Sequence, residues 1–197
     1  MRVEKHSFSP QRGFTLIELM VGITILAILL AIAVPSFRGS MASSRITSST
    51  NEIVSALALA RSEAIRRGTR ISVCKSTNGT GCAAAGGWEQ GWIVFVDTNR
   101  PGGDAAVNAG DVVLTRTGPQ AGELSILGTA AVANYLSFAA DGTVRTMAGT
   151  ALAGRLRVCS TSTAINDARR AREIDVSSAG RIATSVVSLG AACAAPT

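Results

Sequence analysis

The chain has 197 residues, which suits one domain of ordinary size together with an appended segment. Its hydrophobic share of 47% and charged share of 16% exclude a disordered chain, and its net charge of +6 permits attraction to nucleic acid or anionic lipid without requiring it. The only histidine, His6, lies close to the N-terminus, which excludes His-based catalytic triads and metal sites, so we expect no enzyme, no cofactor and no metal ion.

An almost continuous apolar run occupies residues 14–34. As a helix, this run would extend about 31 Å, enough to cross the hydrocarbon core of a bilayer. An ordinary secretory signal is cleaved after such a run at a small-x-small site, but here the run leads directly into Pro35. Basic residues precede the run and few follow it closely, which predicts a transmembrane helix whose N-terminal end faces the cytoplasm.

One carboxylate, Glu18, interrupts the apolar run. Burying it in hydrocarbon costs about 2–3 kcal/mol, so Glu18 is either functional or an acid that reaches the interface from one turn inside the helix. The segment Arg12–Glu18 (RGFTLIE) resembles the class III leader junction of type IV pilins and type II secretion pseudopilins. The resemblance implies that the prepilin peptidase cuts between Gly13 and Phe14 and methylates the new Phe14 amine. It also implies that Glu18 pairs with the N-terminal amine of a neighbouring subunit, and that Pro35 is the helix-kinking proline of these proteins.

The next segment, residues 35–67, is amphipathic. Its apolar residues recur at three- and four-residue spacings with Arg, Ser, Thr and Glu between them, and two arginines precede the helix-stopping Gly68. We therefore expect one long helix over residues 14–67, whose second half packs on a sheet.

Beyond Gly68 the pattern is that of β-structure. Short apolar or alternating segments are separated by Gly-, Asn- and Asp-rich turns. Because strands follow the helix throughout, we expect an α+β fold with a long N-terminal helix and an antiparallel β-sheet head. The resemblance of the leader junction implies that this is a type IV pilin-like fold. Roughly seven strands are predicted, at residues 71–74, 92–96, 112–114, 124–127, 135–138 with 143–145 after a turn, 155–159 and 173–176.

All four cysteines lie beyond the apolar run, and an even number in an exported domain indicates two disulfides. Four cysteines allow three pairings. Local proximity and the tying of a free tail favour Cys74–Cys82 together with Cys159–Cys193.

Three motifs resemble the GspH/FimT group of minor pilins and type II secretion pseudopilins. They are Ala58–Gly68 (ALARSEAIRRG), Trp88–Asn99 (WEQGWIVFVDTN) and the later Phe138-x-x-Asp141-Gly142. Within them, we interpret Arg61 and Glu63 as a helix-surface ion pair, and Trp88 and Trp92 as core aromatics.

The resemblance implies a minor type IV pilin of the FimU or FimT type, incorporated in a tip or initiation complex that supports pilus assembly. Residues 1–13 would be the cleaved leader, 14–34 the transmembrane helix, 35–67 its amphipathic continuation and 68–197 the disulfide-bonded head. The protein would lie in the bacterial inner membrane with a periplasmic head and then enter the pilus. Its partners would be the prepilin peptidase, the inner-membrane assembly platform, other minor pilins and the major pilin. The first alternative is pseudopilin H of type II secretion, with pseudopilins as partners.

The second alternative is a DNA-binding minor pilin for natural transformation, since some members of the group bind DNA through a Gly-Arg-x-Arg motif near the C-terminus. Arg155 and Arg157 in GRLR fit that motif by letter, whereas Arg181 has the expected position but lacks the second arginine. Paired arginines supply phosphate contacts, so this departure weakens the alternative. A further basic cluster would lie near Arg181 if residues 173–182 form a hairpin, namely Arg169, Arg170 and Arg172.

The segment 97–104 superficially resembles a calcium loop. An EF-hand requires Glu at its twelfth position, which is Asn108 here, so we expect a hairpin connection instead.

Overall fold

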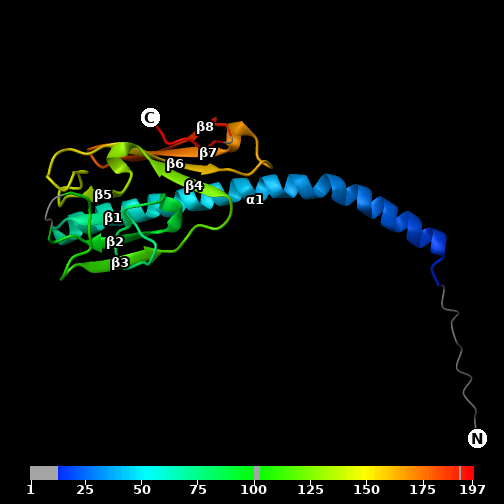
Figure 1. The fold of residues 1–197 in the computed structure, drawn as a ribbon, viewed down its shortest axis with the longest axis horizontal. Helices are drawn as coiled ribbons and strands as arrows, with labels where there is room; N and C mark the ends of the chain where they lie inside the picture. Colours follow the sequence, from blue (N-terminus) through cyan, green and yellow to red (C-terminus); the bar gives the residue numbers. More distant parts are fainter. Residues whose placement is uncertain (1–12, 100–102, 191) are drawn as a thin grey trace, which may run out of the picture. The chain divides into compact units, whose positions relative to one another are not determined.

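The computed structural model describes residues 13–99, 103–190 and 192–197 (Figure 1). The chain divides between Phe37 and Arg38 into an N-terminal unit and a compact head. One helix, α1 (Leu16–Arg67), runs through both units, close to the predicted bounds of 14–67. The predicted leader residues 1–12 lie outside the described residues.

The first half of α1 is apolar and exposed along its whole length. Within the described residues, α1 is the one helix long and apolar enough to cross a membrane. The helix begins at Leu16 because Thr15 caps it, with the Thr15 Oγ1 accepting a hydrogen bond from the Glu18 backbone N–H at 3.2 Å. Pro35 lies inside the helix, where it has no N–H to donate. The kink at Pro35 stays a prediction.

The second half of α1 carries the amphipathic stripe that the sequence predicts. Its apolar side chains are buried in the head, and three alanines four residues apart bring the helix backbone close to its neighbours. The buried apolar set is Ala42, Ile46, Ile53, Ala56, Leu57, Ala60 and Ala64.

The helix ends at Arg67, as expected. Gly68 follows with φ +63°, the left-handed conformation that stops helices. Glu63 accepts hydrogen bonds from Arg66 and then Arg67, which lowers the pKa of its carboxyl. Its partners are therefore these two arginines, and Arg61 is engaged elsewhere.

Two four-stranded sheets, each antiparallel throughout, complete the head and confirm the α+β class. In Figure 1, β1–β3 lie on one side of α1 and β6–β8 on the other. The first sheet has the order β3-β2-β1-β5, with bounds Val112–Thr117, Trp92–Val96, Ile71–Lys75 and Tyr135–Phe138. The second has the order β4-β6-β7-β8, with bounds Leu124–Gly128, Gly154–Ser160, Ala171–Val176 and Ile182–Val187. Three short 3-10 helices connect them, η1 (Trp88–Gln90), η2 (Ala130–Val132) and η3 (Asp167–Arg169).

The core forms where α1 meets both sheets. One cluster of buried side chains joins Leu57 of the helix to Val94 of the first sheet and Ile174 of the second. Trp88 and Trp92 belong to this cluster and are each 1% exposed, which confirms their interpretation as core aromatics.

The observed strands differ from the predicted ones at two places, and the predicted strand at residues 143–145 is wrong. Residues 143–145 form isolated bridges to Phe138 and Ala151 rather than a strand, because tight turns bound the segment on both sides. Conversely, β8 was not predicted. Its small and polar residues give a weak alternation signal, and it is a partly exposed edge strand.

The cysteines form the two disulfides that the sequence favoured. Cys74 near the end of β1 bonds to Cys82 in the following loop. Cys159 in β6 bonds to Cys193, which lies 34 positions later in the sequence. The second disulfide holds the segment after β8 against β6.

Candidate functional site

The exposed half of α1 carries most of the exposed large apolar side chains that the structure describes. These side chains run from Phe14, which is 86% exposed, to Phe37, which is 66% exposed. Soluble monomers rarely expose an apolar surface of this extent, so it marks contact with a membrane or with other protein. The predicted cleavage and methylation positions, Gly13 and Phe14, lie at its start.

Glu18 occupies the third position of α1, three residues after its capping residue. Together Thr15 and Glu18 form the S/T-x-x-E pattern of a capping box, of which the Glu18 N–H to Thr15 Oγ1 bond is one half. A carboxylate in a first turn also interacts favourably with the helix dipole. Sequence reasoning identified Glu18 and missed Thr15, although the T-x-x-E spacing was readable.

Two of the candidate DNA contacts are engaged within the head. Arg157 lies opposite Glu173 in the β6–β7 register, and the two form an ion pair whose side chains are each 11% exposed. The Arg157 guanidinium also donates to the backbone carbonyls of Ala194, at 2.7 Å, and Ala195. Arg155 donates to the Thr197 carbonyl and lies 3.8 Å from Glu173. These side chains therefore fasten the tail to the sheet.

Arg181 is apart from the predicted basic cluster. It is exposed in the turn between β7 and β8. Arg172 pairs with Val186, whereas Val176 pairs with Ile182 beside Arg181, so about 14 Å of strand separates the two arginines. The expected proximity of Arg181 to residues 169–172 is wrong, because an antiparallel hairpin places them at opposite ends.

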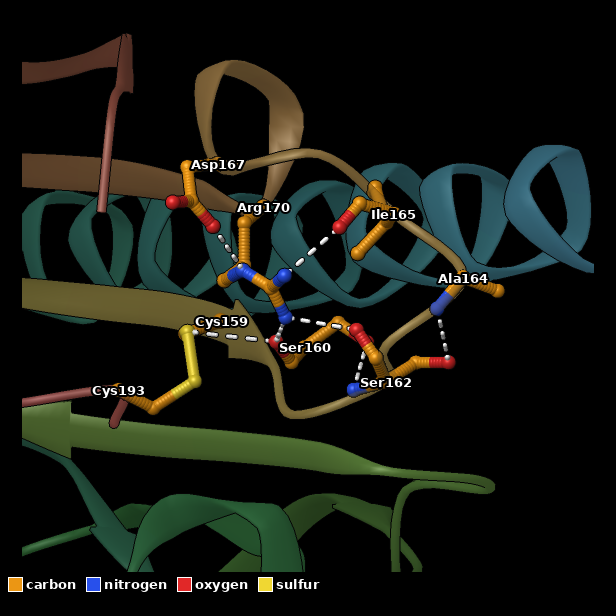
Figure 2. A network of polar contacts seen from close by, with 8 residues as sticks. All are labelled: Cys159, Ser160, Ser162, Ala164, Ile165, Asp167, Arg170 and Cys193. Carbon is orange, nitrogen blue, oxygen red and sulfur yellow. Dashed lines mark hydrogen bonds and ion pairs between the residues drawn. A yellow bond between two sulfur atoms is a disulfide. The ribbon is translucent and has the colours of Figure 1, made fainter. Parts of the chain in front are cut away.

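Arg170 is also not a surface cation. Its side chain is 6% exposed and lies inside the loop between β6 and β7 (Figure 2). It donates hydrogen bonds to the carbonyls of Ser160 at 3.1 Å, Ser162 at 2.6 Å and Ile165 at 2.7 Å, and to the exposed Asp167 carboxylate. Arg170 therefore organises this loop, which lies against the helix at Gly39: a Cβ there would be 2.7 Å from the Ala164 oxygen.

The end of the head near the C-terminal end of α1 is built around two glycines. Gly142 (φ +78°) and Gly180 (φ +77°) meet so closely that a Cβ on Gly180 would lie 2.1 Å from the Gly142 oxygen. Arg61 packs across both turns and donates to the Ala179 carbonyl at 3.4 Å. The glycine before Arg181 is therefore explained by its close packing on Gly142. Arg61 joins the helix to the β7–β8 turn instead of pairing with Glu63.

In the turn that contains Gly142, Asp141 is held in its charged form. Its carboxylate accepts hydrogen bonds from the Thr143 hydroxyl and backbone N–H, and pairs with Arg145 at 3.3 Å. These donors, the Thr143 hydroxyl first, lower the pKa of Asp141 to about 2.

The carboxylates near the segment that resembled a calcium loop are already bonded to protein donors. Asp97 accepts from the Ser72 hydroxyl at 2.6 Å, and Asp111 accepts from Thr98 and Asn108. Across the described residues, no group of three or more His, Cys, Asp or Glu could hold a metal ion.

Comparison with known proteins identifies the chain's relatives. A family model described as "Type II transport protein GspH" matches residues 49–180, and one described as "Prokaryotic N-terminal methylation motif" matches residues 8–34. Over 61 residues, the chain is 46% identical to a "Fimbrial protein" of Pseudomonas aeruginosa. That alignment spans 31% of this chain and 39% of the length of the relative.

Two solved structures, both crystal forms of the type IV minor pilin FimU of Pseudomonas aeruginosa strain PAO1, are similar to part of this chain. The first has 21% identity and a TM-score of 0.48, over 71% of this chain and 91% of FimU. The second has 20% identity and a TM-score of 0.46, over 75% and 88%. The GspH match covers more than half of the chain and includes the end of α1 and most of both sheets, so the chain belongs to the GspH family.

Proposed function

We propose that this chain is a minor type IV pilin, incorporated in a pilus tip or initiation complex that supports pilus assembly. The observation that carries the proposal is the exposed apolar half of α1, which continues along the same helix into a folded head and overlaps the matched methylation motif over residues 14–34. Such a helix can lie in a bilayer and afterwards in the shared core of a filament, because both surroundings bury its apolar side chains.

Under this proposal, the precursor lies in the bacterial inner membrane with its head in the periplasm. The prepilin peptidase removes residues 1–13 and methylates the amine of Phe14. The assembly platform then moves the mature subunit into contact with other minor pilins and the major pilin. Two disulfides in the head suit an oxidising compartment such as the periplasm.

Glu18 would set the axial register of the subunit in the filament. An isolated carboxylate in an apolar helix bundle is costly, and the cost falls when the charged amine of a neighbouring Phe14 lies against it. We expect Glu18→Ala to reduce the incorporation of this subunit, whereas Glu52→Ala, an exposed acid on the same helix within the head, leaves it unchanged. Equal incorporation of both variants would refute the register role.

The proposal is tested by the amount of pilus sheared from cells that lack the gene. Complementation with the intact gene should restore pili lost in the deletion strain. Normal pili in the deletion strain would refute the proposal.

Pseudopilin H of type II secretion is the alternative function, and the description of the matched family names type II transport. Loss of exported enzymes from the medium, with pili intact, would identify it. A DNA-binding role has less support, because Arg155 and Arg157 hold the tail. Salt-dependent DNA binding by the head that is lost on Arg181→Ala would revive it.

A further inference from the structure

The two sheets have four edge strands, and edge strands offer unpaired backbone groups to other chains. Proteins usually protect such edges with charges, bulges or covering segments. Three of the four edges here have an identifiable protection.

In β4, the Glu89 carboxylate accepts a hydrogen bond from the Ile126 backbone N–H at 2.8 Å. In β5, the segment after the Asp141 turn covers the edge, with the Arg145 N–H donating to the Ser137 carbonyl at 2.9 Å. In β3, the pairing with β2 contains a register shift, and the exposed Arg116 adds a charge.

The fourth edge, β8, has none of these protections. Its sequence, Ile182–Val187 (IATSVV), contains no charge and no proline, and its register with β7 is unbroken over six residue pairs. Thr184 and Ser185 are exposed, and Val186 is 61% exposed. The strand is therefore regular, uncharged and open, which are the properties that favour strand addition.

A cavity of about 450 Å³ adjoins the end of β8, lined by Ser43 of α1, Val186, Ala168 and two arginines, Arg169 and Arg172. None of the lining residues is acidic. The register places Thr184 and Val186 on the same face of the sheet as the buried Ile174, so a side chain of an added strand on that face would point toward the cavity. The two arginines favour a carboxylate there.

We propose that β8 binds an extended edge segment of a different pilin-type subunit, with alternating apolar residues and an acidic side chain that enters this cavity. The inference rests on the proposed membership of a pilin assembly. A second copy of this chain fits poorly. Pairing through β8 of a second copy would bring no carboxylate to the cavity, because Ile182–Val187 (IATSVV) contains no acidic residue.

The test is photo-crosslinking in cells with the full-length chain, carrying benzoylphenylalanine in place of Thr184. The matched control carries it in place of Val112, which is 57% exposed on the β3 edge. We expect the Thr184 position to give an adduct with another subunit that bears an N-terminal methylation motif, and the Val112 position to give none. Absence of that adduct, an adduct with a second copy alone, or the same adduct from both positions would overturn the inference.

The need for positive charge in the cavity is tested by a second pair of matched variants. Arg172→Glu should abolish the adduct, while Arg116→Glu on the β3 edge should leave it. Equal adduct in the two variants would refute the acidic partner. These readouts need a pilin-type neighbour but not a pilus, so they are distinguishable from failure of the proposed function, in which deletion leaves pili intact.

Discussion

Replacing Arg170 by Met tests how much one buried guanidinium stabilises the head. The substitution keeps an apolar stem and removes the donors to the carbonyls of Ser160, Ser162 and Ile165 (Figure 2). A buried acceptor that loses its partner costs about 1–3 kcal/mol, and some of these carbonyls will recruit water, so we expect a loss of about 3–5 kcal/mol in the free energy of unfolding. The Asp167 carboxylate contributes little to this figure, because its side chain is 62% exposed.

The assay is urea unfolding of the head alone, residues 38–197, followed by the fluorescence of the buried tryptophans. Arg169→Met is the matched control, because Arg169 is exposed, and its effect should stay within about 0.5 kcal/mol. Asp167→Asn should cost less than about 1 kcal/mol. If the free energy of unfolding of Arg170→Met lies within about 1 kcal/mol of that of Arg169→Met, the three carbonyls do not depend on Arg170 and the reasoning is wrong.

Three further predictions concern the head. Gly180→Ala should destabilise the head by about 2–3 kcal/mol in the same urea assay, because a Cβ at this position would lie 2.1 Å from the Gly142 oxygen. A loss of stability smaller than that caused by a substitution at an exposed helix site would contradict this prediction. In the folded head the pKa of Asp141 is lowered from 3.8 to about 2, so the stabilisation by its carboxylate is present above pH 4 and is lost as the pH falls toward 2. In Asp141→Asn, the free energy of unfolding should therefore change less between pH 4 and pH 2 than in the unmodified protein. Replacing Cys159 and Cys193 by Ser should lower the free energy of unfolding by about 4 kcal/mol, against about 2.5 kcal/mol for the disulfide with the shorter loop, and an inverted order would refute the loop-length argument.

The sequence predicted those parts of the fold whose signals are local. Hydrophobic periodicity and the Gly68 stop define α1, and an unbroken apolar run defines β2, because burial on both sides leaves a strong pattern. The edge strand β8 escaped prediction because a partly solvated strand tolerates Ala, Thr and Ser.

The roles of the arginines could not be predicted, because they depend on strand register. Arg157 meets Glu173 only after β6 and β7 are aligned, and Arg181 is separated from Arg172 by the same antiparallel geometry. Arg170 lies among carbonyls of a loop that carries no local pattern. Charge counting along the chain treats all of these residues as equivalent cations, whereas the fold makes some structural and leaves others exposed.

The central claim is that this chain is a processed subunit of the pilus. The most direct measurement is mass spectrometry of purified, sheared pili from wild-type cells, searching for the N-terminal peptide of this chain. We expect a peptide that begins at Phe14 with a methylated amine. Recovery of the chain only from the membrane fraction, or with residues 1–13 still attached, would contradict the account.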